Sequence, residues 1–302
     1  MSEMLQINAL LTLLDDPDQE VWEAAYAALL QAPYEQIETL QEYLDGESDS
    51  HLLSERLANC IKEIGIRHHG QLLCDWKARG GENLLEALVY ICRFRYPDVS
   101  ETGLLEQLET LRLDAWLEFH YDLTSFEKVK ILNYILFQLH GFRGDEEHFL
   151  HHDNSFINKV LETKKGNPIS LSIVYMLVAQ RLNVPVYGIN LPRHFIMAYV
   201  ENEETENLGS FNDKQVISHE ASGEIKFYIN AYNGGGVFNQ QHLQSIMKEM
   251  ELEEKPEYML PCSNADIVLR VLMNLYNSYS ASKKPEALFI DRIITNFRDL
   301  YV

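Results

Sequence analysis

The first third of the chain has the hydrophobic spacing of amphipathic helices. Within residues 10–33, apolar side chains recur at helical spacing, and an acidic, proline-containing run at residues 15–18 interrupts the pattern. An aspartate of this run is the expected N-cap of a second helix, which ends before Pro33. A weaker copy follows, with one helix ending near Leu44 and another across residues 52–61. Because one hairpin leaves an apolar face uncovered, two in succession predict stacked helical repeats.

Two more amphipathic helices are expected in the middle of the chain, over residues 124–141 and 153–166. For the second of these helices, Asp153 or Asn154 is the expected N-cap, because a short polar side chain can accept a hydrogen bond from the first turn. Gly166 is its expected end, since glycine readily adopts the conformation that closes a helix.

Residues 167–183 are apolar on nearly every side, which is typical of a helix buried at the centre of a domain. Pro168 suits its first turn, where a missing N–H breaks no hydrogen bond. Short strands are predicted at residues 184–191, 194–200, 214–220 and 225–232. A buried helix beside an antiparallel sheet defines an α+β domain, and the many helices elsewhere make the protein mainly α.

The charge of the chain is strongly negative, at −21 from 46 acidic and 25 basic residues. Such a field repels phosphate backbones and anionic lipids, so we expect no nucleic-acid partner and no membrane surface. The favoured explanation of the negative charge is that it keeps the protein soluble. The functional alternative is that it attracts a basic protein partner. No apolar run approaches the roughly 20 residues of a membrane span.

The cysteines show neither metal-ligand spacing nor a disulfide framework. There are four of them, Cys60, Cys74, Cys92 and Cys262. We interpret them as reduced, mostly buried thiols, which is typical of a cytoplasmic protein. The first residues lack the basic start and the cleavage site of a signal peptide, which also favours the cytoplasm.

The predicted order of elements is that of papain-like and transglutaminase-like enzymes: a helix, a strand, a strand with a histidine and a strand with an acid. In such enzymes the positive end of the helix dipole lowers the pKa of a cysteine thiol. The histidine completes the ion pair and protonates the leaving group, and a third residue orients the imidazole. Residues 164–200 supply the helix, the first strand and the strand with the histidine, but they contain no cysteine.

The sequence between residues 125 and 244 resembles the SirB-one family, a bacterial branch of the transglutaminase-like superfamily. The matching phrases are a glycine-phenylalanine-x-glycine loop at residues 141–144, Asn154 and Ser155 before a V-L-E helix, and G-N-P-I-S-L-S from Gly166. The phrase P-x-H-F and a turn similar to D-P-F-N-G-G follow. The C-terminal helices resemble the family's tetratricopeptide-like helices, and the N-terminal spacing resembles a HEAT repeat.

This resemblance assigns the three positions of the catalytic triad to Pro168, His194 and Asn230. Proline has no nucleophile and asparagine brings no charge, so we expect no catalytic residue. The rival interpretation is an amidase or peptidase that uses His194 with Ser170 or with a metal. For Ser170, a hydroxyl satisfied within the core is favoured over a nucleophile. The candidate cleft comprises Asn167, Ser170, Arg193, His194, Tyr232 and Asn233.

A histidine-rich segment contains three candidate metal ligands, His148, His151 and Asp153. Zinc sites usually place their histidines on one face, whereas His151 and the adjacent His152 are expected to point apart. A solvated loop is therefore favoured, and we expect no metal and no cofactor. The glycines at 234–236 are expected to form a tight turn with positive φ, since no lysine-serine pair follows them as in a phosphate loop.

These observations predict three segments. They are a helical-repeat domain over residues 1–118, a transglutaminase-like domain over residues 119–260 and a helical pair over residues 261–302. The predicted function is a non-catalytic scaffold or regulator with a protein or peptide partner. Helical repeats offer concave binding faces, and an inactive cleft can still hold an extended chain.

Overall fold

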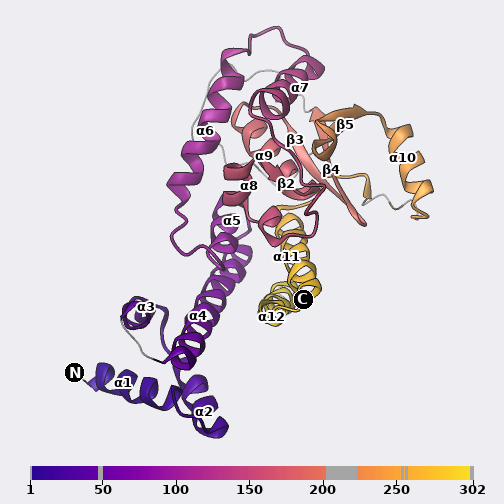
Figure 1. Cartoon of the computed structure of the whole chain (residues 1–302). Coiled ribbons are helices and arrows are strands. Elements are labelled where there is room, and N and C mark those ends of the chain that lie inside the picture. Colours follow the sequence, from indigo (N-terminus) through magenta and orange to yellow (C-terminus); the bar gives the residue numbers. More distant parts are fainter. Residues whose placement is uncertain (1, 47–49, 202–222, 253–254, 256–257, 300–302) are drawn as a thin grey trace.

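The computed structural model describes residues 2–46, 50–201, 223–252, 255 and 258–299. This part of the chain is mainly helical with one small antiparallel sheet, which confirms the predicted α+β, mainly α class (Figure 1). The strand predicted at residues 214–220 lies outside the described residues. The α-helices are α1 (Ser2–Leu14), α2 (Gln19–Leu29), α3 (Ile37–Asp45), α4 (His51–Ala78), α5 (Leu84–Cys92), α6 (Glu101–Leu117), α7 (Ser125–Asn133), α8 (Ile157–Thr163), α9 (Pro168–Arg181), α10 (Gln240–Glu249), α11 (Asn264–Ala281) and α12 (Glu286–Asp299).

Helices α1 to α3 pack around the first half of α4, at one end of the molecule (Figure 1). Asp18 is the N-cap of α2, as predicted, and accepts a hydrogen bond of 2.9 Å from the Glu20 N–H. The Arg56 guanidinium of α4 lies 4.2 Å from the centre of the Trp22 ring and donates to the Leu14 carbonyl at 2.7 Å. The helical hairpins are therefore present, and their interpretation as repeats stays a prediction.

Helix α4 is longer than the hydrophobic pattern predicts. It has 28 residues and continues through Gly65 and Gly70. A glycine inside a helix costs about 1 kcal/mol relative to alanine. Gly70 nevertheless has a packing role, because a Cβ there would lie 2.7 Å from Ile293 of α12. Ile64 packs in the N-terminal cluster and Ile66 in the central one, so α4 joins the two.

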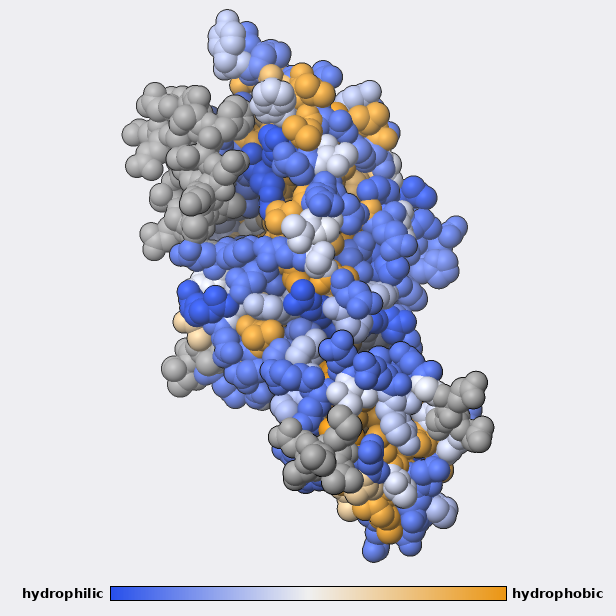
Figure 2. Space-filling view, turned by 90° about the vertical axis from the view of Figure 1, so that its left-hand side faces the viewer, coloured by the Kyte–Doolittle hydropathy of each residue, from blue (hydrophilic) through white to orange (hydrophobic). Residues whose placement is uncertain are grey.

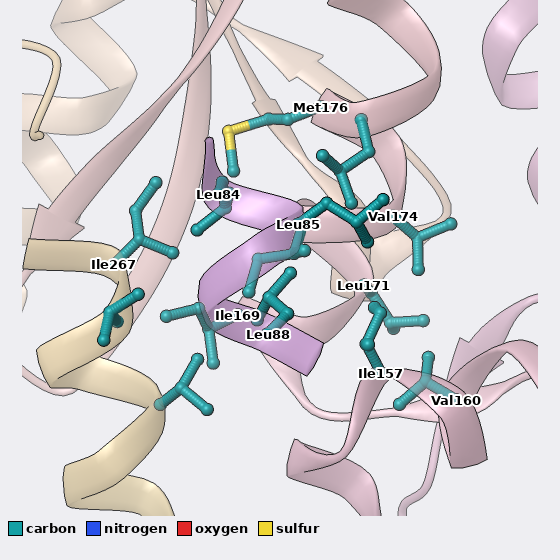
Figure 3. Close-up of a cluster of buried hydrophobic side chains, with 14 of the residues drawn as sticks. Leu84, Leu85, Leu88, Ile157, Val160, Ile169, Leu171, Val174, Met176 and Ile267 are labelled. Carbon is teal, nitrogen blue, oxygen red and sulfur yellow. The ribbon is translucent and has the colours of Figure 1, made fainter. Parts of the chain in front are cut away.

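Helix α9 forms the centre of the molecule. Every residue from 169 to 179 is buried, which confirms the predicted central helix. Figure 3 shows side chains of α5, α8, α9 and α11 meeting in one hydrophobic cluster. The same cluster includes the second half of α4, as well as α6 and α12. Hydrophobic contacts thus cross both predicted segment boundaries, and the three-segment division stays a prediction.

The main sheet has the strand order β3-β4-β5-β6 and is antiparallel throughout. Its strands are β3 (Val186–Leu191), β4 (His194–Glu201), β5 (Glu224–Asn230) and β6 (Gly236–Phe238), and a separate parallel ladder joins β1 (Arg143–Gly144) to β2 (Lys165–Gly166). Helix α9 covers one face of the main sheet, and α10, which the sequence pattern did not reveal, packs on the other. In the predicted glycine turn, Gly234 and Gly235 have φ of 59° and 76°, whereas Gly236 already belongs to β6.

The segment that precedes α9 differs from the prediction. His152–Ser155 forms a 3₁₀ turn and α8 begins after it, so neither Asp153 nor Asn154 is the N-cap of that helix. Lys164, in a left-handed conformation with φ of 60°, ends α8 before Gly166 is reached. Gly166 belongs instead to β2. Its pairing with β1 ties the segment after the π-helix Tyr134–Leu139, which continues α7, to the start of α9.

The face of the molecule seen in Figure 2 is mainly hydrophilic, with hydrophobic patches near its upper and lower ends. Large apolar side chains exposed on α6 are Leu113, Trp116 and Leu117. Among the helices of the described residues, none combines the length and the apolar character that crossing a membrane requires.

Candidate functional site

A buried network of hydrogen bonds holds the start of α9. The Asn167 Oδ1 accepts the Ser170 N–H at 3.0 Å, and the Asn167 N–H donates to the Ser170 Oγ at 3.0 Å. The Asn167 Nδ2 donates to the Ser155 Oγ at 2.9 Å. The Ser170 hydroxyl also donates to the Asn167 carbonyl at 3.2 Å, so it is engaged as both donor and acceptor. Two of the sequence motifs that resemble the SirB-one family, one around Ser155 and one around Asn167, therefore contact each other at the N-terminus of α9.

Pro168 occupies the first position of α9, as predicted. Its ring supplies neither an N–H nor a nucleophile at the positive end of the helix. Ser172, the other hydroxyl of the first turns, donates to the Pro168 carbonyl at 2.8 Å and is 0% exposed. Both serine hydroxyls of this helix start thus serve the backbone.

His194 and Asn230 lie on neighbouring strands, β4 and β5. Side chains alternate along β4, so that Phe195 joins the cluster around α9 while Ile196 joins the cluster under α10. The same alternation places His194 on the Ile196 face, away from α9. On β5, Ile229 packs toward α9, and Asn230 therefore faces the same way as His194. The histidine and asparagine positions share one sheet face, and α9 lies against the other.

The residues of the turn after β5 take structural positions. The Asn230 Oδ1 accepts the Asn233 N–H at 3.3 Å and so caps the turn. Tyr232 packs edge-on against Phe149, with ring centroids 6.0 Å apart. The Tyr232 ring also fills the space beside Gly144, where a Cβ would lie 2.4 Å from it. Asn233 is exposed.

A cavity of about 230 Å³ opens at the N-terminus of α9. We call it the α9 cavity; its lining residues are Phe149, Leu150, His151, Ser155, Asn167, Pro168, Ile169, Arg193, Phe195, Arg270, Asn274, Asn277 and Ser278. Of the predicted cleft residues, Asn167 and Arg193 line it, together with Pro168. The other four, Ser170, His194, Tyr232 and Asn233, do not.

The contribution of α11 to this cavity was not predicted from the sequence. Arg270, Asn274, Asn277 and Ser278 lie at helical spacing in a helix whose other face is apolar, and all four line the cavity. This polar stripe was the signal that could have revealed them. The Ser278 hydroxyl donates to the Leu150 carbonyl at 2.6 Å and so holds the loop wall of the cavity against α11.

The α9 cavity is positively charged in a chain with a net charge of −21. Arg193 and Arg270 line it, and among the described residues no aspartate or glutamate does. The Arg270 Nη1 donates to the Asn190 Oδ1 at 3.3 Å and to the Leu191 carbonyl at 3.2 Å. Burial lowers the pKa of Arg270. Partial burial, and then the charge of Arg270, lower the pKa of His194, which favours its neutral imidazole.

The histidine-rich segment brings His151, His152 and Asp153 together, with possible ligand atoms within 4.8 Å of one another. The expectation that the two adjacent histidines point apart is wrong, because the 3₁₀ turn brings their ring centroids to 4.3 Å. His148 is not part of this group, and its Nδ1 lies 3.7 Å from a carboxylate oxygen of Asp145.

Two neighbours already use the carboxylate of this histidine group. The Tyr96 hydroxyl donates to the Asp153 Oδ1 at 2.6 Å. The Arg95 Nε lies 3.9 Å from the same oxygen, and its positive charge opposes a cation there. The group therefore has the residue types of a metal site, but Arg95 already offsets the negative charge of its one carboxylate.

The four cysteines are free thiols, and none of them lines the α9 cavity. Burial raises the pKa of Cys60, Cys92 and Cys262 to about 12. Burial also raises the pKa of Cys74. Each cysteine therefore stays a thiol at neutral pH, and no thiolate replaces the missing nucleophile.

Several known proteins are similar to part of this chain. A UPF0162 protein of Xylella fastidiosa (strain 9a5c) is 27% identical over 217 residues, which are 70% of this chain and 70% of that protein. A UPF0162 protein of Vibrio cholerae is 28% identical over 141 residues, 46% of this chain and 44% of that protein. F-box only protein 21 of Mus musculus is 32% identical over 81 residues, 27% of this chain and 13% of that protein. No solved structure matches.

The family model of the transglutaminase-like superfamily matches residues 102–273. That range contains α7 to α10, the main sheet and the first half of α11. It therefore includes the named lining residues of the α9 cavity except Asn274, Asn277 and Ser278, in the second half of α11. More than half of the chain is matched, and the order of central helix and antiparallel strands agrees with the predicted domain. The chain belongs to the transglutaminase-like superfamily.

Proposed function

We propose that this protein is a non-catalytic member of the superfamily that binds a segment of another protein, or a peptide, at the α9 cavity. The observation that carries the proposal is Pro168, which stands at the positive end of α9 where a catalytic cysteine would be activated. Within the superfamily, the sequence phrases support the SirB-one branch. The four free thiols support a location in the cytoplasm.

Three further observations support the loss of catalysis. The Ser170 hydroxyl is 1% exposed and engaged in the helix cap. His194 lies on the sheet face opposite to α9, so the two groups that the rival amidase or peptidase would combine do not face each other. Asn230 brings no charge and caps a turn.

The test of catalysis uses isotopic water. The full-length protein is incubated with a complex peptide mixture in H₂¹⁸O, with and without a primary amine that traps acyl transfer, and products are followed by mass spectrometry. Hydrolysis of any amide bond places ¹⁸O in the new carboxylate. We expect no protein-dependent labelling and no amine adducts, with papain as the positive control. Turnover that disappears in His194→Ala or Ser170→Ala contradicts the proposal.

The test of binding uses one obstructing substitution and a matched control on the same helix. Asn277 lines the cavity and is exposed, so Asn277→Trp places a large ring at the opening. Ser280 is exposed on α11 but does not line the cavity, and Ser280→Trp is the control. Immobilised protein should retain a subset of peptides that Asn277→Trp loses and Ser280→Trp keeps. Equal retention by all three proteins would place binding elsewhere.

A further inference from the structure

Among the described residues, the two arginines of the α9 cavity have no anionic partner. Within the described part of the chain, no carboxylate lies within ion-pair distance of Arg193 or Arg270, although acids outnumber basic residues 46 to 25 in the sequence. Arg270 uses one nitrogen to bond the neutral groups of Asn190 and Leu191, which orients its guanidinium. Arg270 is partly buried, so without a counter-ion it has lost hydration that a bound anion restores, whereas Arg193 is exposed.

Arg193 occupies a strained position in the turn between β3 and β4. Leu191 and His194 pair across this turn, which leaves Pro192 and Arg193 as its two central residues. The φ of Arg193 is 63°, a left-handed conformation that favours glycine or asparagine. A side chain other than glycine pays about 1 kcal/mol or more there. The strain and the cavity location together indicate that the guanidinium is kept for a ligand.

Two residues that line the same cavity have a hydrogen-bond donor with no acceptor among the described residues. Pro168 has no N–H and the Ser170 N–H is bonded to Asn167, whereas the Ile169 N–H has no acceptor among the hydrogen bonds of the described residues. The Ser155 hydroxyl is 5% exposed and accepts from Asn167, but it donates to no described acceptor. Both residues line the cavity. The 14-residue helix α9 adds its positive end.

The rest of the lining is apolar and the space is small. Phe149, Leu150, Ile169 and Phe195 supply hydrophobic walls. The volume of about 230 Å³ is below the range of pockets that enclose whole cofactors. It suits one amino-acid residue with an apolar side chain. A chain terminus carries its carboxylate and its last side chain on the same carbon, so both can be bound within so small a space.

We infer that the α9 cavity binds the C-terminal carboxylate of a polypeptide whose last residue is apolar. The inference rests on the proposed function and names the part of the partner that enters the cavity. Arg193 and Arg270 pair with the carboxylate, the Ile169 N–H and the Ser155 hydroxyl donate to it, and the phenylalanine and leucine side chains contact the last side chain.

The experiment compares two fluorescein-labelled hexapeptide pools that have a random sequence before a final leucine. One pool ends in a free carboxylate and the other in a carboxamide, and binding to the full-length protein is measured by fluorescence anisotropy. Charge-assisted hydrogen bonds favour the acid pool about tenfold to a hundredfold. N-acetylleucine should compete with the acid pool at lower concentration than inorganic phosphate.

Two variants identify the groups responsible. Arg193→Gly removes the guanidinium and relieves the strained φ, so the protein should keep or raise its melting temperature and lose about tenfold in affinity for the acid pool. Arg270→Gln should lose a similar factor, and Arg270→Lys should lose less because it keeps the charge. The control is Arg79→Gln, at an arginine that is paired with Glu86 and does not line the cavity. It should bind as the unaltered protein does.

The outcomes separate this inference from the proposed function. Equal binding of acid and amide pools, or acid binding that survives Arg193→Gly, overturns the carboxylate inference and leaves peptide binding standing. Stronger competition by phosphate overturns it in favour of a phosphate site. If neither pool binds and no peptides are retained by the immobilised protein, the proposed function fails together with the inference.

Discussion

Replacing Asn167 tests whether the start of α9 is held by its buried cap. Asn167→Ala removes the side chain that accepts the Ser170 N–H and donates to Ser155, each at 3.0 Å or less. Loss of an N-cap costs about 1 kcal/mol. Leaving a buried partner without its hydrogen bond costs about 1–3 kcal/mol more. Asn167 is 6% exposed, so water cannot readily replace these bonds. We expect the free energy of unfolding to fall by about 2–4 kcal/mol.

The matched control is an exposed cap of the same kind. Thr124 forms a capping box with Glu127 at the start of α7, and its loss should cost only about 1 kcal/mol. Urea unfolding, followed by tryptophan fluorescence and by circular dichroism, measures both variants at pH 7. Asn167→Asp should recover much of the loss, because its carboxylate still accepts at the helix end and can take a hydrogen bond from Ser155. A cost for Asn167→Ala no larger than that of Thr124→Ala would refute the reasoning.

Three other measurements probe the packing, the titration and the geometry of the site. On α4, Gly65→Ala should raise the free energy of unfolding by about 0.5–1 kcal/mol, because the nearest side-chain atom is 3.9 Å from the new Cβ. Gly70→Ala should lower the free energy of unfolding by about 1–3 kcal/mol, because a Cβ there would lie 2.7 Å from Ile293 of α12. Changes of the same sign in urea unfolding would contradict the close approach of the two helices. Burial, and then neighbouring positive charges, lower the pKa of His69 to about 4. As the pH falls, the unfolded chain therefore protonates at His69 before the folded protein does. The contribution of His69 to the free energy of unfolding is fully present above about pH 6.5 and is lost as the pH falls toward 4. His69→Asn should remove part of that loss between pH 7 and 5, and an unaltered pH profile would exclude His69 as a cause. A thiol introduced by Pro168→Cys should alkylate with a midpoint below the ordinary value of about 8.5, and His194→Ala should leave the midpoint unchanged because His194 faces away from α9. A midpoint that rises in the double variant would show that the imidazole reaches the helix end.

Local signals predicted the elements whose ends are encoded in a few neighbouring residues. Asp18 before α2, Pro168 at the first position of α9 and the glycine turn after β5 each reflect backbone chemistry that is independent of distant contacts. The burial of α9 could also be predicted from the sequence, because a helix that is apolar on all sides is stable only when it is surrounded by protein.

Features that depend on distant partners were not predicted. Gly70 is a weak point for a helix in isolation, and only the approach of Ile293 from α12 gives it a role. The β1–β2 ladder is too short to leave any pattern in the sequence. The direction of the His194 side chain could not be predicted for another reason. Both faces of β4 are buried, so its apolar residues do not alternate with polar ones, and the sequence does not indicate which side chains face α9.

The positive charge of the α9 cavity was hidden by the acidic composition of the chain. A net charge of −21 describes the whole surface, whereas Arg193 and Arg270 are far apart in the sequence and meet only through the packing of α11 against β3. Of the two, only Arg193 was among the predicted cleft residues, because it precedes the histidine of the triad position. Arg270 could have been found only from the polar stripe of α11.

The length of helix α4 has a consequence for the order in which parts of the protein unfold locally. Its 28 residues span about 42 Å, and its buried apolar residues up to Ile64 pack in the cluster with α1 to α3, whereas those from Ile66 onward pack in the central cluster. The first part rests on a small cluster and the second on the large central one, so local opening should start at the N-terminal end and stop near Gly65. Amide hydrogen exchange along this single helix should therefore be fast before Gly65 and slow after it. One continuous helix would then report the stabilities of two separate cores.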